Sequence, residues 1–70
     1  MLPADYAIVI HGEIGVDLSS AFAPWTLSTA EGLTTIHARA IDQAALHGIF
    51  DTVRSLGLTL VDVHRLGETG

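Results

Sequence analysis

Four histidines are the side chains of this sequence best suited to chemistry: His11, His37, His47 and His64. Neutral imidazole is a good ligand for zinc or nickel, and it exchanges protons near neutral pH. If the strands that carry His11 and His37 are neighbours, we expect both side chains close together on one face of a sheet, near Arg39. Their spacing matches no metal-binding motif, so they are weak candidate metal ligands and we expect no cofactor. The alternative is a polar rim around a dimer contact.

Covalent catalysis finds little support in the remaining side chains. The chain contains no cysteine and no lysine, which removes a thiolate nucleophile and a Schiff-base amine. Its serines do not form the G-x-S-x-G motif of a nucleophile elbow. The carboxylates suit helix caps, turns and solvated surfaces. A non-enzymatic protein is therefore favoured, and a small enzyme that uses His11 or His37 as an acid–base group is the least favoured alternative.

The helix predicted over Asp42–Leu56 is the element around which the rest of the chain is organised. Its apolar residues recur at the spacing of a helix with one buried side; they are Leu46, Ile49, Phe50, Val53 and Leu56. Asp42 suits the N-cap, and Gly57 suits the left-handed position that follows a helix. Gly48 is less favourable than alanine inside a helix by about 1 kcal/mol. We therefore expect Gly48 to allow a close approach to the sheet or to a partner.

Four strands and a second helix are predicted around that long helix. β-Branched and aromatic residues predict strands at 6–11, 25–30, 33–41 and 58–65, and Glu31-Gly32 predicts a hairpin turn. Residues 16–23 have the spacing of a short helix, which Pro24 ends. The order βαββαβ predicts an α+β, ferredoxin-like split βαβ fold: a four-stranded antiparallel sheet, order 4-1-3-2, with two helices on one face. If residues 16–23 are not helical, the alternative is a β-meander followed by one helix and a closing strand.

Length and composition limit the domain organisation and the partners. Seventy residues form one small domain, predicted over 6–65 between a lead-in at 1–5 and a flexible tail at 66–70. With a net charge of −5 and only three arginines, the chain lacks the cationic face that nucleic acids and anionic membranes require. The sequence shows neither a long apolar span nor the pattern of a signal peptide, so we expect an acidic, cytoplasmic protein.

An apolar strip on the sheet suggests how so short a chain is stabilised. A chain of this size buries only about 60% of its unfolded surface, and oligomerisation is a common remedy. The apolar alternation breaks in residues 58–65, which indicates either a β-bulge or a sheet covered on both faces. Four residues would then form an apolar strip on the helix-free face: Ala7, Val9, Val61 and Val63. We expect this strip to be the interface of a homodimer, with sheets face to face or edge strands paired across a two-fold axis. Another protein is the alternative partner.

The turn Gly12-Glu-Ile-Gly15 is the candidate ligand-binding segment. A glycine turn before a helix can cradle an anion, but this one carries no basic side chain and is typical of an ordinary turn. In length and topology the chain resembles ACT regulatory domains, whose ligand lies near the first strand-to-helix turn at a dimer interface. That resemblance implies a small-ligand sensor in which Gly12, Glu13 and Gly15 bind the ligand. The Asp-x-Pro-Gly start of the first helix in ACT domains is missing here.

A more specific resemblance lies in the long helix. Asp42-Gln-Ala-Ala-Leu-His-Gly48, followed by an apolar helix and Leu56-Gly57-Leu58, resembles a group of short uncharacterised bacterial proteins, mainly from actinobacteria. The likeness covers about residues 33–63 and implies no activity. If Gln43, His47 and Gly48 belong to a shared signature, the polar start of this helix is a contact surface. The leading hypothesis for function is a non-enzymatic interaction or accessory module that acts as a homodimer.

Overall fold

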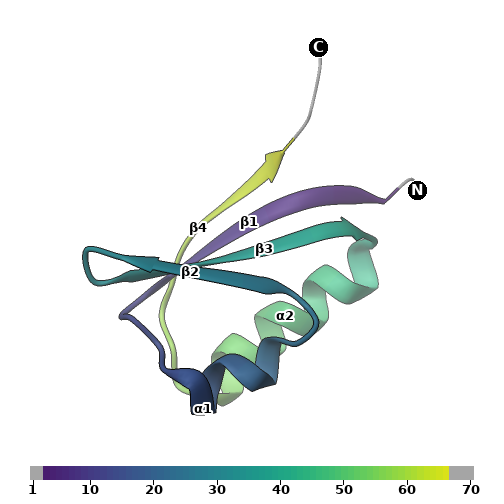
Figure 1. Cartoon of the computed structure of the whole chain (residues 1–70). Coiled ribbons are helices and arrows are strands. Elements are labelled where there is room, and N and C mark those ends of the chain that lie inside the picture. The colour runs from purple at the N-terminus through teal and green to yellow at the C-terminus, as the bar shows by residue number, and fades with distance from the viewer. Residues whose placement is uncertain (1–2, 67–70) are drawn as a thin grey trace.

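The chain forms one antiparallel sheet with helical segments packed on one of its faces (Figure 1). The computed structural model describes residues 3–66. Its elements are, in order, β1 (Ala4–His11), α1 (Val16–Ser19), η1 (Ser20–Phe22), β2 (Thr26–Ala30), β3 (Leu33–Ile41), α2 (Gln43–Ser55) and β4 (Leu60–Leu66). This order confirms the predicted α+β, split βαβ architecture, with a first helical segment that is one α-turn followed by a 3-10 turn.

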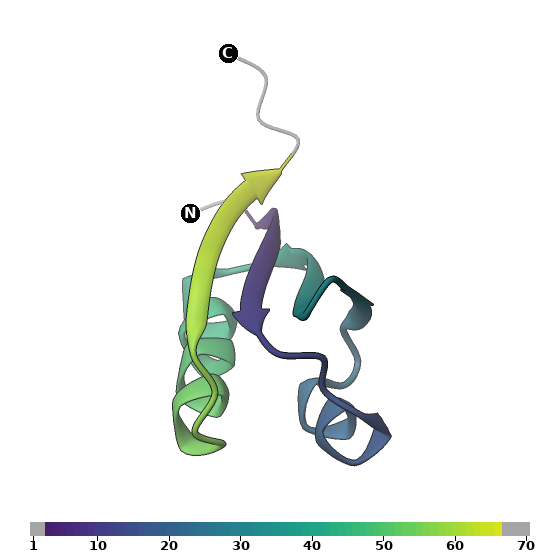
Figure 2. The same ribbon diagram turned by 90° about the vertical axis from the view of Figure 1, so that its left-hand side faces the viewer.

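The strands lie side by side in the order β2-β3-β1-β4, and every neighbouring pair is antiparallel. This is the predicted order 4-1-3-2. Both crossover connections pass over the same face of the sheet, with α2 on the side of β4 and α1 on the other side (Figure 2). We call the covered face the helix face and the opposite face the helix-free face.

The helix face of the two central strands forms the floor of the core. In the ladder between β1 and β3, Ile8 lies opposite Ile36 and Ile10 lies opposite Thr34, and all four are fully buried. The helical segments cover them with four buried side chains: Phe22, Leu46, Ile49 and Val53. Because side chains alternate between the faces of a sheet, the residues between these positions point to the helix-free face.

Local interactions begin and end α2 where the sequence predicts. Asp42 Oδ1 accepts a hydrogen bond from the Ala45 amide at 2.8 Å, which confirms Asp42 as the N-cap. At the other end Gly57 has a φ of 73°, and the Leu58 amide donates to the Val53 carbonyl at 3.0 Å. This left-handed termination is the one that glycine favours. Neither α2 nor any other helix within residues 3–66 has the length and apolar character needed to cross a membrane.

The first helical segment is shorter than the predicted helix over residues 16–23. One turn of α-helix, α1, passes into the 3-10 turn η1, which ends at Phe22. Ala23 is extended, with a ψ of 144°, because the residue before a proline avoids the helical region. The tighter turn places Phe22 in the core, where its side chain is only 1% exposed.

A β-bulge explains the broken alternation of the last strand. The ladder between β1 and β4 shifts between Val9 and Ile10, so that Val61 of β4 is the extra residue. Beyond the bulge Val63 lies opposite Ile8, on the helix face, and packs against the core. The prediction that Val61 and Val63 share the helix-free face with Val9 is therefore wrong, because the bulge shifts the phase of the strand.

The ends of the strands differ from their predicted positions by a few residues. β1 begins at Ala4, within the predicted lead-in, and β4 includes Leu66 from the predicted tail. β2 begins at Thr26 and β4 at Leu60, so both start later than the apolar pattern suggests. The rest of the predicted tail, residues 67–70, lies outside the described residues.

Among the described residues, nothing packs where a Gly48 side chain would be, although the Gly48 carbonyl accepts a hydrogen bond from Thr52 Oγ1 at 3.0 Å. A methyl group at this position would meet nothing within 4 Å, and the residue is exposed on α2. The expected close approach to the sheet is therefore wrong, while a close approach to a partner stays a prediction.

We expect Gly48→Ala to raise the free energy of unfolding by about 1 kcal/mol, because alanine is the better helix former and the space around it is open. The matched control Gly57→Ala should lower it by about 1 kcal/mol, because a Cβ disfavours the left-handed backbone at that position. Urea unfolding followed by circular dichroism measures both changes. A loss of stability on Gly48→Ala would contradict the open surroundings of Gly48.

Candidate functional site

The helix-free face separates the two histidines that the sequence suggests as a pair. His37 lies opposite Ala7, whereas His11 lies opposite Leu33. Positions 7 and 11 of β1 are about 13 Å apart at the usual rise of a strand. The predicted proximity of His11 and His37 is therefore wrong, although their strands are neighbours, because the register offsets them. Within residues 3–66, no group of three or more histidine, aspartate or glutamate side chains is placed to hold a metal ion.

His64, rather than His11, shares a row of the sheet with His37. Ala7 of β1 lies opposite His37 on one side and opposite His64 on the other, which puts the histidines about 10 Å apart. Each has a polar neighbour: Ser28 Oγ lies 3.0 Å from His37 Nε2, and Asp62 Oδ2 lies 2.6 Å from His64 Nε2. Sequence reasoning missed the place of His64 because the bulge hid which face it occupies.

The outer edge of β4 turns some of its backbone groups away from the sheet. The His11 amide donates to the Thr59 carbonyl just before β4, so the odd-numbered residues of β1 are those whose backbone groups face β4. The backbone groups of their partners, Asp62 and His64, therefore point toward β1, and the backbone groups of Val63 point away from the sheet. The Val63 amide donates instead to Asp62 Oδ1 at 2.9 Å. The Asp62 carboxylate is therefore hydrogen-bonded to the backbone amide with which a neighbouring strand would pair.

The predicted ligand-binding turn is tied down by hydrogen bonds within the chain. The Gly12 amide donates to the Gly32 carbonyl at 2.6 Å, and Glu13 Oε2 accepts from the Gly32 amide at 2.9 Å. The Gly15 carbonyl accepts from the Ser19 amide at 2.9 Å, in the only turn of α1. These residues fasten the β2–β3 hairpin and the start of α1, and ligand binding by Gly12, Glu13 and Gly15 stays a prediction.

Thr34 closes the same turn from inside the core. Its hydroxyl donates to the Gly12 carbonyl at 2.7 Å and accepts from the Ile14 amide at 3.1 Å, while the residue itself is fully buried. Both backbone groups would lose their partner if this hydroxyl were absent. The sequence places Thr34 on a strand face with isoleucine and alanine, so its polar role becomes visible only in the structure.

We expect Thr34→Val to lower the free energy of unfolding by about 1–3 kcal/mol, because it leaves a partly buried carbonyl and a partly buried amide without the hydroxyl as a partner. The same change at Thr35, on the helix-free face, is the matched control and should alter stability by less than about 0.5 kcal/mol. Urea unfolding of both variants measures the difference. Equal effects at the two positions would show that the hydroxyl does not hold the turn.

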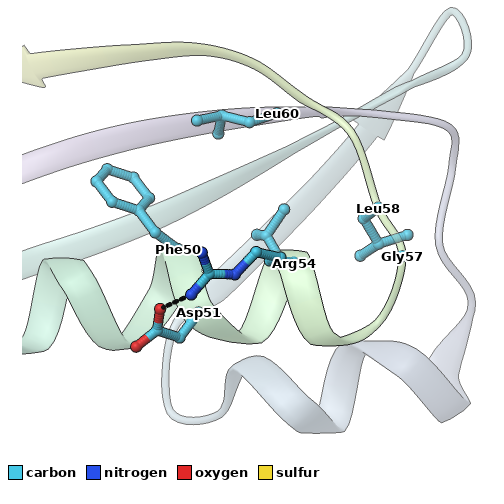
Figure 3. Close-up of a pocket in the computed structure, with 7 residues that line it drawn as sticks. Phe50, Asp51, Arg54, Gly57, Leu58 and Leu60 are labelled. Atoms are coloured by element: carbon cyan, nitrogen blue, oxygen red, sulfur yellow. Dashed lines mark hydrogen bonds and ion pairs between the residues drawn. The ribbon is translucent and has the colours of Figure 1, made fainter.

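An apolar groove lies between α2 and β4 (Figure 3). It has a volume of about 450 Å³ and is lined by Phe50, Asp51, Val53, Arg54, Gly57, Leu58 and Leu60. Phe50 extends from α2 toward the strands, where Leu60 lies. Arg54 and Asp51 form an ion pair of 2.8 Å on the solvent side of the helix, so the charges stand at the rim.

Four of the five large apolar side chains exposed among the described residues lie on β4 or at the end of α2. Leu60, Val61 and Leu66 of β4 are 44%, 51% and 43% exposed, and Leu56 at the end of α2 is 36% exposed. We call these four residues the β4 surface. Leu18 of α1, at 38%, is the other large apolar side chain exposed among the described residues. The second edge strand, β2, is shorter and exposes mainly threonine and serine.

The four predicted interface residues do not form one strip. Ala7 and Val9 lie on the helix-free face, where His37 and His64 flank Ala7. Val63 lies on the helix face, and Val61 stands at the bulge on the edge. The apolar surface therefore lies along the edge of the sheet rather than over its face, and Val61 is the member of the predicted strip that belongs to the β4 surface.

The family model described as Domain of unknown function (DUF8691) matches residues 5–64. This range begins in β1 and ends in β4, so the model spans every element of the fold. No curated protein and no solved structure matches the chain. The description of this family assigns no activity.

Proposed function

We propose that this chain, which belongs to the DUF8691 family, is a non-enzymatic interaction module that forms a homodimer through β4. In the dimer the outer edges of two β4 strands pair antiparallel across a two-fold axis, and the two sheets become one continuous sheet. The observation that carries the proposal is the β4 surface, which together with the apolar groove at the start of β4 lies on an edge strand that pairs with no further strand among the described residues.

An exposed apolar edge is unusual in a protein that acts alone. Natural sheets protect edge strands with charged side chains, proline, β-bulges or a covering segment, since an open edge invites another strand. In β4 this protection consists of the bulge at Val61 and the Asp62 carboxylate on the Val63 amide. β4 contains neither lysine nor proline, and three of its seven residues are exposed leucine or valine. A second copy paired along β4 would remove Val61 and Leu66 from water and bring its own β4 surface against the groove.

The residue pattern of β4 is complementary to a second copy of itself. With the two-fold axis at Val63, Asp62 of each copy lies opposite His64 of the other copy, and Val61 lies opposite Arg65. The outward amide of Val63 then donates to the carbonyl of Val63 in the second copy. An axis at Asp62 would instead place two carboxylates opposite each other, which is destabilising in antiparallel pairs. Avoiding this repulsion between carboxylates therefore favours the register centred on Val63 over the one centred on Asp62.

We also propose that the protein is cytoplasmic. A different protein is the alternative partner for β4. The likeness of Asp42–Gly48 to short bacterial proteins, mainly from actinobacteria, favours a second contact surface at the start of α2. Its members would be Gln43, His47 and Gly48, which are all exposed. This second surface lies on α2 and is independent of the pairing of β4.

We expect Val61→Lys to weaken self-association of the chain at least about tenfold, or about 1.4 kcal/mol. Each new ammonium would lie opposite Arg65 of the other copy, where like charges repel. Val61 is half exposed, so the substitution should leave the monomer folded. Sedimentation equilibrium over a range of protein concentrations measures the association constant.

Leu18→Lys is the matched control, because it makes the same change in charge at an exposed apolar residue away from β4. It should leave the association constant within about twofold of the wild-type value. A wild-type chain that remains monomeric at millimolar concentration would overturn the proposal, and so would equal losses in the two variants.

A further inference from the structure

We propose that the dimer binds one divalent transition-metal ion, of which zinc is the best fit, through Asp62 and His64 of both copies. This inference rests on the proposed pairing of β4. The site is incomplete in one chain, where these two side chains supply only two donors and no third ligand from the described residues joins them.

Asp62 and His64 are already placed as a pair of neighbouring donors. They occupy positions i and i+2 of β4 and lie opposite Val9 and Ala7, so both side chains project from the helix-free face. Asp62 Oδ2 and His64 Nε2 are 2.6 Å apart, and the two side chains are 50% and 61% exposed. A solvent-borne ion can therefore reach both groups without any change in the core.

The two-fold axis at Val63 would bring a second such pair alongside the first. Directly opposite residues of an antiparallel pair have Cβ atoms about 5 Å apart, and positions i and i+2 of one strand are separated by about 7 Å. Two carboxylates and two imidazoles then form the corners of a small rectangle on one face of the sheet. Two oxygen and two nitrogen donors around one centre suit the tetrahedral coordination that zinc adopts in proteins.

Pairing of the strands and binding of the metal should reinforce each other. In the single chain Asp62 Oδ1 accepts from the Val63 amide, which is the amide that the second strand needs. When the Val63 carbonyl of the second copy takes over that amide, the carboxylate of Asp62 is released toward the metal. A ligand that binds only the paired form shifts the equilibrium toward it. The ion also offsets repulsion between two chains that each carry a net charge of −5.

His37 provides the control that distinguishes metal binding at Asp62 and His64 from unspecific metal binding by a histidine on the same face of the sheet. It lies on the same face as His64 but across β1, about 10 Å away, and its Nε2 lies 3.0 Å from Ser28 Oγ. Metal held through the β4 pair should not depend on His37. His37→Ala is therefore the matched control for His64→Ala.

The experiment uses the full chain without an affinity tag, in sedimentation equilibrium with EDTA, with zinc chloride or with magnesium chloride. We expect zinc, and not magnesium, to raise the association constant at least tenfold in the wild type and in His37→Ala. Calorimetry should give one zinc ion for two chains, and cobalt in its place should show the absorption of a tetrahedral site. His64→Ala and Asp62→Asn should lose the effect of zinc.

The outcomes separate this inference from the homodimer on which it rests. A dimer in EDTA that zinc does not strengthen, or that zinc strengthens equally in His64→Ala, overturns the metal site and leaves the homodimer standing. One zinc ion bound by each monomer also overturns it. A chain that is monomeric under all three conditions overturns both.

Discussion

The packing of one helix stripe against one face of the sheet is the interaction on which the rest of the structure depends. Leu46, Ile49 and Val53 of α2 cover the isoleucines of β1 and β3, and η1 adds Phe22 beside them. Seventy residues can supply helices for one face of a four-stranded sheet only. The helix-free face and the edge strands, where the candidate sites lie, are not covered by these helices.

The uncovered surfaces differ in character, and the difference locates the proposed interaction. The helix-free face carries histidine, serine and threonine around Ala7 and Val9, neither of which is exposed. The edge at β4 instead exposes leucine and valine, and its outward amide at Val63 is held by a neighbouring carboxylate. The edge therefore combines exposed apolar side chains with a backbone group that an added strand can take over.

Sequence reasoning succeeded where the controlling interactions are local. The N-cap at Asp42, the left-handed Gly57 and the Glu31-Gly32 turn depend on residues within a few positions of one another, and each forms as predicted. The strand order followed from the sequence of elements together with general rules of connection. The failures across strands have two causes: the register of β1 with β3 separates His11 from His37, and a bulge at Val61 changes the face of Val63. The broken alternation of the last strand indicated a bulge as one of two possibilities but did not decide between them.

The sequence by itself determined which segments are helix or strand, where α2 begins and ends, and which side of it is buried, because hydrophobic period and capping act along the chain. Only the tertiary structure decided which side chains meet across strands. Register is a property of two strands together, and one inserted residue reverses the faces on one side of it. The row of His37 and His64, the separation of His11 from His37 and the apolar margin of β4 all follow from that non-local choice.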